Sequence, residues 1–342
     1  MRISLHTKAE RSTMSRTRTT TTIAALAAVA AMTLAACSST EAAPEESADA
    51  APATVTIEDN HGSVEVPVNP ETVVALDNHV FETLSSWDIP LAAAPKGVMG
   101  EGLWPEYMEE SVLDVGNHRE PNLEMIVAAQ PDLIIGGYRF SEAYDDIVAQ
   151  NPDAVVIELA PREGEEIGSE LVRVTEALGQ IFDREDEAAE IVGAYEDSLT
   201  AATEAYDGES TVMTLMASGG ELSYIAPVNG RSLGMLYPTL DLVPAIEQDG
   251  STDHMGDDIN VEAIVAANPD WIVVMDREGA MQSSAEVYVP PAELIEGSEA
   301  LQSVTAVQQG TVIYTSPSFY LTEDIQTYTA TYQQLADAFA GV

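Results

Sequence analysis

Two stretches of this 342-residue chain repeat nearly the same unit, 138 positions apart. They read NLEMIVAAQPDLIIGGYR from Asn122 and NVEAIVAANPDWIVVMDR from Asn260, and ten of the 18 aligned positions are identical. In each copy an asparagine suited to cap a helix precedes apolar residues at helical spacing, and Pro-Asp ends the helix. The apolar run that follows is typical of a strand buried on both faces of a parallel sheet. The unit therefore predicts a duplicated helix-strand element in an α/β protein.

Both copies end on an arginine, Arg139 in the first and Arg277 in the second, just past the predicted strand. Ligands of open α/β sheets bind outside the carboxyl ends of the strands. Two lobes that face each other would present both arginines to one cleft, so we expect an anion clamp. The alternative is that each arginine pairs with a local acid, such as Glu142 or Glu278.

The rest of the pattern predicts two Rossmann-like lobes with central, mostly parallel sheets, over 54–182 and 207–342, bridged by one long α-helix over 183–206. That helix has Asp183 as its expected N-cap. The sequence TVTIEDNHGSVEVP predicts an opening hairpin. Strands are expected at 72–76, 91–95, 132–137, 154–159, 211–218, 221–227, 271–276 and 311–316, and helices from near His79, Trp104, Asn122, Glu142 and Asp324.

The first 36 residues read as a secretion signal, because a basic start leads into a short apolar run. The run ends in LAAC, the pattern at which a bacterial lipoprotein is cut and lipidated, so Cys37 is the expected lipid anchor. Residues 37–53, rich in Ala, Ser, Glu and Pro, are expected to form a disordered tether. Either Met1 or Met14 could start the protein, since MSRTRTTTT alone is a sufficient basic prefix.

The chain is strongly acidic, with 13 Lys and Arg against 58 Asp and Glu and a formal net charge of −45. Five of the basic residues lie in the signal segment. Such a surface repels nucleic acid and anionic lipid, so we expect no nucleic-acid partner. Because basic residues are so few in the rest of the chain, the position of each remaining arginine is informative about binding.

Six motifs together resemble one family: the two repeat units, the opening DNHGSVEVPVNPETVVAL, the NGRSLG loop, HMGDDIN and SFYLTEDIQTY. They are similar to bacterial lipoproteins of the catecholate type, which capture ferric siderophores and hand them to ABC importers. The resemblance implies two lobes joined by a rigid helix, a shallow cleft and no enzymatic activity. It also implies an ABC permease with its ATPase as partners, attachment to the extracytoplasmic face of the membrane, and no resident cofactor beyond the Fe(III)-siderophore carried as ligand. We expect a monomer.

The resemblance also implies the site residues. In such proteins three arginines ring the cleft, and a histidine and a tyrosine fill iron positions that a tetradentate siderophore leaves open. The matching residues here are Arg139, Arg231, Arg277, His254 and Tyr320. Guanidinium groups can offset a ferric catecholate's negative charge and stack on its rings, and imidazole and phenolate both ligate iron. Relatives place the loop arginine where this chain has Ser232, so Arg231 lies one residue early and the clamp could contain two arginines instead of three.

Delivery to the permease is expected to use acids on the rim of each lobe, for which Glu106 and Asp241 are candidates. Without the resemblance, His254 would read as an exposed loop residue and Tyr320 as a half-buried aromatic.

Two other functions are compatible with parts of the sequence. A haem or cobalamin receptor would share the lobes and the helix and differ only in the cleft. A secreted serine esterase is the second, because GRSLG matches a nucleophile elbow and Ser232, Asp253 and His254 follow in triad order. The esterase leaves the duplicated units unexplained, and the elbow requires a strand running directly into the serine.

Overall fold

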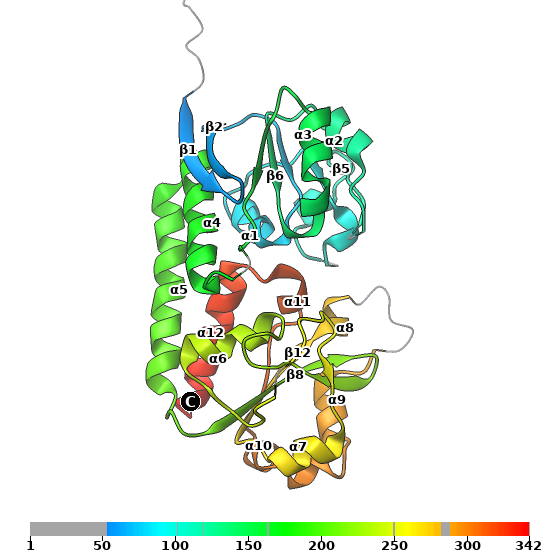
Figure 1. Ribbon diagram of the computed structural model, residues 1–342, viewed down its shortest axis with the longest axis vertical. Helices are drawn as coiled ribbons and strands as arrows, with labels where there is room; N and C mark the ends of the chain where they lie inside the picture. Colours follow the sequence, from blue (N-terminus) through cyan, green and yellow to red (C-terminus); the bar gives the residue numbers. More distant parts are fainter. Residues whose placement is uncertain are drawn as a thin grey trace, which may run out of the picture. The chain divides into compact units, whose positions relative to one another are not determined.

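The computed structural model describes residues 53–341 apart from 101, 118, 163, 249 and 282–287 (Figure 1). The predicted signal, Cys37 and nearly all of the predicted tether lie outside these residues. The chain enters the fold through a hairpin in which β1 (Thr54–Asp59) pairs antiparallel with β2 (Gly62–Pro67). Asn60 and His61 form its turn, as the sequence predicts.

The first lobe is built on a parallel five-stranded sheet in the order β5-β4-β3-β6-β7. Successive residues of β6 alternate between two apolar clusters, with Leu133 and Ile135 in one and Ile134 in the other. Both faces of the sheet are therefore covered, which explains the unbroken apolar run. The strands are β3 (Val73–Ala75), β4 (Ala93–Ala94), β5 (Leu113–Asp114), β6 (Leu133–Gly136) and β7 (Val155–Glu158).

The helical segments of this lobe are mostly short. The helix expected near Trp104 is only a four-residue 3₁₀ turn, and the two-residue strand β5 has no apolar run that could have predicted it. The segments are α1 (Asn78–Ser86), η1 (Lys96–Val98), η2 (Pro105–Met108), α2 (Leu123–Ala129), η3 (Tyr138–Ala143) and α3 (Tyr144–Gln150).

Two long helices connect the lobes, where the sequence predicted one. They are α4 (Ile167–Phe182), which the pattern analysis missed, and α5 (Glu185–Ala205), and they run side by side (Figure 1). Both reach both cores, because Leu171 of α4 packs in the second lobe and Ala188 of α5 packs in the first. Because both helices contribute to both cores, the structure does not test the predicted domain boundaries at 182/183 and 206/207, and these stay predictions.

The assignment of Asp183 as an N-cap is wrong. Asp183 ends α4 in the left-handed conformation, with φ 54°, and its N–H bonds the carbonyl of Gly179. Arg184 begins α5 without a side-chain cap. Aspartate is tolerated in this backbone region, so a residue typical of helix starts serves here as a helix end.

The second lobe has a mixed sheet in the order β11-β9-β8-β12-β13, with β10 also paired to β8. β8, β10, β12 and β13 are parallel, whereas β9 and β11 add an antiparallel edge. The strands are β8 (Thr211–Ser218), β9 (Glu221–Tyr224), β10 (Val243–Pro244), β11 (Asp257–Asp258), β12 (Trp271–Asp276) and β13 (Val312–Tyr314).

The last helix, α12 (Ile325–Phe339), begins at Asp324 as predicted, and the side chain of Asp324 accepts from the N–H of Thr327 at 2.7 Å. α12 packs along α5 and fills the second core with Tyr328, Tyr332 and Leu335. The other helical segments are η4 (Ser232–Met235), α6 (Leu236–Leu240), α7 (Val261–Ala267), α8 (Arg277–Ala280), α9 (Pro291–Glu296), η5 (Leu301–Ser303), α10 (Thr305–Gln309) and α11 (Phe319–Thr322).

The duplicated sequence unit forms the same local structure in both lobes. Asn122 and Asn260 cap α2 and α7 through their side chains, and both helices end at a left-handed residue just before the Pro-Asp pair. Each unit then supplies the strand that lies between two others of its sheet, β6 or β12. Among the described residues, no helix combines the length and apolarity that a membrane crossing needs.

Candidate binding site

Arg139 lies in η3, immediately after the strand of the first repeat unit. The chain passes close to Asp77 there, because a Cβ on Gly137 would meet Asp77 Oδ2 at 2.5 Å, so this position requires glycine. The Nε of Arg139 donates to Asn78 Oδ1 at 3.2 Å. A neutral amide, not a carboxylate, therefore positions this guanidinium group.

Arg277 is the first residue of α8, after the strand of the second unit. Its Nη1 donates to Ser218 Oγ at 3.3 Å, whereas its Nε is buried without a partner among the described residues. The neighbouring Glu278 accepts from the N–H of Gly219 at 2.7 Å. Within the described part of the chain, neither Arg139 nor Arg277 forms an ion pair, so the local pairing considered for them is absent there.

Arg231 and Arg277 meet at Tyr320, a buried residue of α11. The guanidinium carbon of Arg231 lies 4.7 Å from the ring centroid and that of Arg277 lies 5.2 Å from it, within the range of cation-π attraction. The Nη2 of Arg231 also reaches the Tyr320 carbonyl at 3.4 Å. Three of the five residues that the resemblance indicated are thus in contact.

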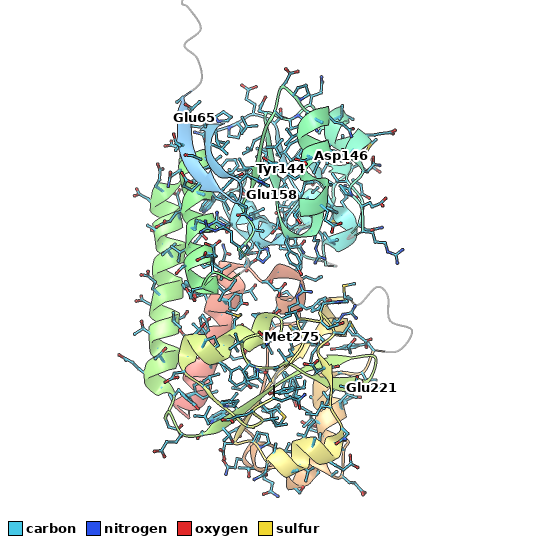
Figure 2. The ribbon with its side chains drawn as sticks, in the orientation of Figure 1. Glu65, Tyr144, Asp146, Glu158, Glu221 and Met275 are labelled. Carbon is cyan, nitrogen blue, oxygen red and sulfur yellow. The ribbon has the colours of Figure 1, made fainter. Side chains whose placement is uncertain are left out.

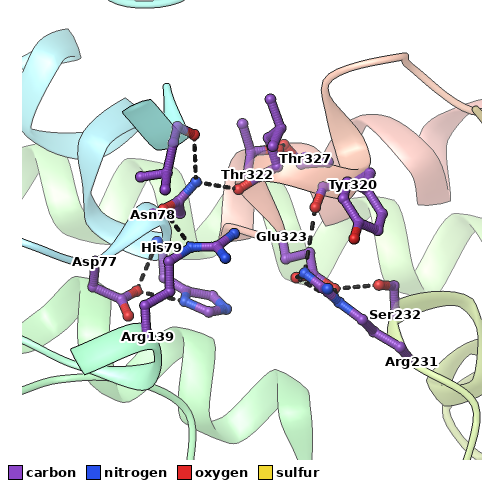
Figure 3. A network of polar contacts seen from close by, with 12 residues as sticks. Asp77, Asn78, His79, Arg139, Arg231, Ser232, Tyr320, Thr322, Glu323 and Thr327 are labelled. Atoms are coloured by element: carbon purple, nitrogen blue, oxygen red, sulfur yellow. Dashed lines mark hydrogen bonds and ion pairs between the residues drawn. The ribbon is translucent and has the colours of Figure 1, made fainter. Parts of the chain in front are cut away.

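Arg231 is also held by a carboxylate that the sequence analysis did not single out. Its Nε lies 3.1 Å and 3.2 Å from the two carboxylate oxygens of Glu323, and its Nη2 forms a closer ion pair with the same group (Figure 3). Ser232 Oγ donates to Glu323 as well. Burial acts to raise the pKa of Glu323, but the charges of Arg231 and His79 and the hydrogen bonds outweigh it, and the pKa is lowered.

On the first lobe, Asp77, Asn78 and His79 form a second polar group at the start of α1 (Figure 3). His79 Nδ1 lies 2.5 Å from Asp77 Oδ1, and the Nδ2 of Asn78 donates to the Leu321 carbonyl of the other lobe at 2.7 Å. Asn78 therefore links Arg139 to the residue that follows Tyr320.

Charge coupling shifts the pKa values of Asp77 and His79 in opposite directions. Burial disfavours the imidazolium of His79, but Asp77, with Glu323 and Asp324 further away, raises its pKa overall. Burial acts to raise the pKa of Asp77, and the nearby His79 more than reverses this, so that pKa is lowered. The triplet Asp-Asn-His directly after the apolar strand β3 was the sequence signal that could have identified these residues.

Three of the sequence-predicted residues lie outside this network. His254 is exposed, and its side chain pairs with that of Asp253, with Nδ1 and Oδ1 3.7 Å apart. Glu106 and Asp241 are exposed on different lobes, Glu106 accepting from the hydroxyl of Ser85. The structure thus brings Arg231, Arg277, Tyr320 and, through Asn78, Arg139 together, and it does not bring His254 to them.

The geometry of Ser232 does not match an esterase nucleophile. The strand before it, β9, ends at Tyr224, so no strand runs directly into the serine. Its hydroxyl is bound to Glu323, and no described contact joins it to His254. The elbow suggested by GRSLG is therefore a loop of another kind.

A cavity of about 650 Å³ lies beside Arg231. Its walls come from both lobes: they include Gly137, Tyr138, Ser141, Glu158 and Arg162 on one side, and residues 228–232 with Met235 on the other. Figure 2 labels Glu158, which lines the cavity, and the nearby Tyr144 on the first lobe. It also labels Met275, near the end of β12, on the second lobe. Exposed Tyr138 and Arg162 also line the cavity and were not predicted. Arg231 connects this space to Tyr320 and Arg277.

Comparisons with known proteins agree with this architecture. A family model described as periplasmic binding protein matches residues 73–318. The chain is 27% identical over 267 residues to the petrobactin-binding protein YclQ of Bacillus subtilis, a match covering 77% of this chain and 80% of the relative. It is 24% identical over 273 residues to the ferric-anguibactin-binding protein FatB of Vibrio anguillarum, covering 78% and 82%.

Among solved structures, a TroA-like periplasmic binding protein from Xylanimonas cellulosilytica superposes with a TM-score of 0.70 at 25% identity, covering 84% of this chain and 98% of that one. The family match spans most of the chain, including both sheets and both copies of the repeat. Members of this family are substrate-binding proteins of transport systems and not enzymes, which removes the esterase alternative. The chain belongs to the periplasmic binding protein family.

Proposed function

We propose that this protein is an extracytoplasmic receptor for a ferric siderophore of catecholate or mixed type, which it delivers to an ABC importer. The observation that carries the proposal is the meeting of Arg231 and Arg277 at Tyr320, with Arg139 linked to it through Asn78. Two relatives named for ferric or siderophore ligands support the ligand class.

The proposed chemistry is charge compensation with iron coordination. A ferric catecholate is an anion with planar aromatic rings, and guanidinium groups both offset the charge and stack on such rings. Arg139 and Arg277 have no carboxylate partner in the described chain and supply free positive charge. Tyr320 would complete an unsaturated iron centre through its phenolate. His254 would be the second ligand, and since it is exposed in this structure, its loop must move toward the cleft to act.

The remaining parts of the proposal concern membrane attachment and delivery. Cys37 would carry the lipid that holds the receptor at the outer face of the cell membrane. Glu106 and Asp241, exposed on the two lobes, would contact basic sockets of the permease, whose ATPase drives uptake. The receptor would act as a monomer and carry no cofactor apart from its cargo.

A ligand-panel titration of the purified full-length chain tests the proposal. The three tryptophans provide a fluorescence signal, and the panel is ferric tris-catecholate, ferric bis-catecholate, ferric hydroxamate, haem and cobalamin. We expect saturable, submicromolar binding confined to the catecholates, with a shift of the iron charge-transfer band where Tyr320 coordinates. Tight binding of haem or cobalamin instead would keep the fold and overturn the ligand.

Coordination by His254 has its own test. Changing His254→Ala should weaken a tetradentate ferric complex much more than a hexadentate one, because only the tetradentate ligand leaves iron positions open. Equal losses for both complexes would remove the coordination role while leaving the receptor proposal standing.

A further inference from the structure

Glu323 occupies an unusual position in the backbone. It directly follows α11 in the left-handed conformation, with φ 45° and ψ 24°. This region is unfavourable for a residue with a long side chain, and glycine or asparagine is the common choice after a helix. Strain of this kind persists where the surroundings determine it and gathers at functional sites. Only 14% of the Glu323 side chain is exposed.

Neighbouring residues use most of the hydrogen-bonding capacity of the Glu323 carboxylate. Arg231 contacts both oxygens through Nε and Nη2, and Ser232 donates to one of them. A carboxylate accepts about four hydrogen bonds, so little capacity is left for other donors. The bidentate pair of Arg231 with Glu323 depends on hydrogen-bond geometry as well as on charge. An anion that displaced Glu323 would have to supply both the paired hydrogen bonds and the negative charge.

The other arginines near the cleft show that this pairing is selective. Arg162, on the cavity wall, is held in the same way by Glu170, with Nε and Nη2 at 2.9 Å and 2.5 Å from its oxygens. Among the described residues, the partners of Arg139 and Arg277 are neutral: Asn78 for Arg139, and Ser218 and the Tyr320 ring for Arg277. His79 is matched by Asp77. Of the basic groups gathered here, two arginines therefore keep an uncompensated charge.

We infer that Glu323 is a charge-selecting residue of the binding site: by neutralising Arg231 it leaves two free positive charges, which favours a weakly anionic ferric chelate over a highly anionic one. This inference rests on the proposed function. Four anionic catecholate oxygens around Fe³⁺ give a complex of charge −1, whereas six give −3. The site therefore takes the bis-catecholate in preference to the tris-catecholate.

The experiment measures the ratio of the dissociation constants for ferric tris-catecholate and ferric bis-catecholate, in the purified full-length chain at fixed salt. Changing Glu323→Gln frees the charge of Arg231 in a low-dielectric site, so the ratio should shift toward the tris-catecholate by about tenfold. Glu124→Gln, on the exposed first turn of α2, makes the same formal change of charge away from the site and should leave the ratio unchanged.

A double variant separates charge from structure. Arg231→Gln with Glu323→Gln removes the pair without changing the net charge, so affinities can fall but the ratio should return to that of the wild type. The double variant also provides a test if Glu323→Gln folds poorly because Arg231 is left buried and unpaired. A ratio that is the same in wild type and Glu323→Gln, or that shifts equally in the single and double variants, overturns the inference and spares the receptor proposal. Failure of the wild type to bind either chelate overturns both.

Discussion

The two copies of the repeated unit are alike in their framework and different at their ends. In both, an asparagine caps a seven-residue helix, a left-handed residue ends it, and a buried strand follows. In both, the aspartate of Pro-Asp accepts from a threonine where the neighbouring strand begins: Asp132 from the N–H of Thr72, just before β3, and Asp270 from the N–H and hydroxyl of Thr211, the first residue of β8.

Beyond the strand the copies diverge. Arg139 is bound to Asn78, next to the Asp77–His79 pair, whose charge depends on pH. Arg277 has a buried Nε without a described partner and lies over Tyr320, whose other cation is already neutralised by Glu323. The repeated part thus forms the same helix-strand framework in both lobes, whereas the partners of the arginine that follows it differ.

The largest expected difference between the copies is in ligand affinity. Arg277→Met should weaken binding of a ferric catecholate by about 1.5 to 3 kcal/mol, roughly ten- to a hundredfold, because its charge has no carboxylate partner among the described residues and lies directly over Tyr320. Arg139→Met should cost less, since its Nε is already used by Asn78. Arg184→Met, on an exposed pair with Glu187, is the matched control in the fluorescence titration. Equal losses at all three positions would contradict the difference.

The next effect tests the framework. Asp270→Ala leaves the N–H and hydroxyl of Thr211 without their acceptor in a half-buried place and should lower the free energy of unfolding by about 2 kcal/mol. Asp132→Ala, at an exposed position, should cost about 1 kcal/mol. Urea unfolding followed by circular dichroism measures both. A larger cost at Asp132 than at Asp270 would reverse the expected order.

The helix caps should differ less. Asn122→Ala and Asn260→Ala each remove one side-chain cap, for about 1 kcal/mol of stability. The bond from Ala263 N to Asn260 is 2.8 Å, shorter than the 3.3 Å from Met125 N to Asn122, so Asn260→Ala should be the more costly of the two. Serine at either position, which can also cap, should restore most of the loss; if it does not, capping is not the cause.

The smallest effect at neutral pH concerns the titrating pair of the first lobe. The pKa of His79 is raised above the ordinary 6.5, so the stability from its charge is present in full below pH 6.5 and is lost as the pH rises through the raised value. Asp77→Asn should therefore be more destabilising near pH 6 than near pH 9. Urea unfolding across this range, with the His79 ring signal followed by NMR, measures it. A stability difference that grows with pH would contradict the account.

The stability that the Asp77–His79 pair contributes is also limited at low pH. Because the pKa of Asp77 is lowered from 3.8, its contribution is present above pH 3.8 and is lost only as the pH falls through the lowered value. The Arg231–Glu323 pair of the second lobe has no titration on the alkaline side in this range, because arginine stays protonated. The two lobes should thus be distinguishable by their response to alkali.

Much of the framework follows from local sequence. The hairpin, the capping asparagines, Asp324 at the start of α12 and most strands of the two larger sheets are set by neighbouring residues, and these were predicted within a few positions. The failures also have local causes. Strand β5 is two residues long, and Asp183 has a side chain that suits either end of a helix.

The site could be predicted only in part. Arg139, Arg277 and Tyr320 could be predicted as site residues because strand ends and familiar motifs mark them. The partner of Arg231 is 92 positions away, and its identity depends on how two left-handed residues, Ser232 and Glu323, turn their side chains toward each other. Asn78 likewise reaches Leu321 across 243 positions. Sequence spacing contains no information about such contacts.

The most direct test of the account is the position of iron in a crystal of the protein with ferric bis-catecholate, located by anomalous scattering. We expect an iron peak within coordination distance of the Tyr320 hydroxyl, with the chelate rings against Arg139 and Arg277. A peak elsewhere, such as in the 680 Å³ cavity between β9 and α7 in the second lobe, would contradict it.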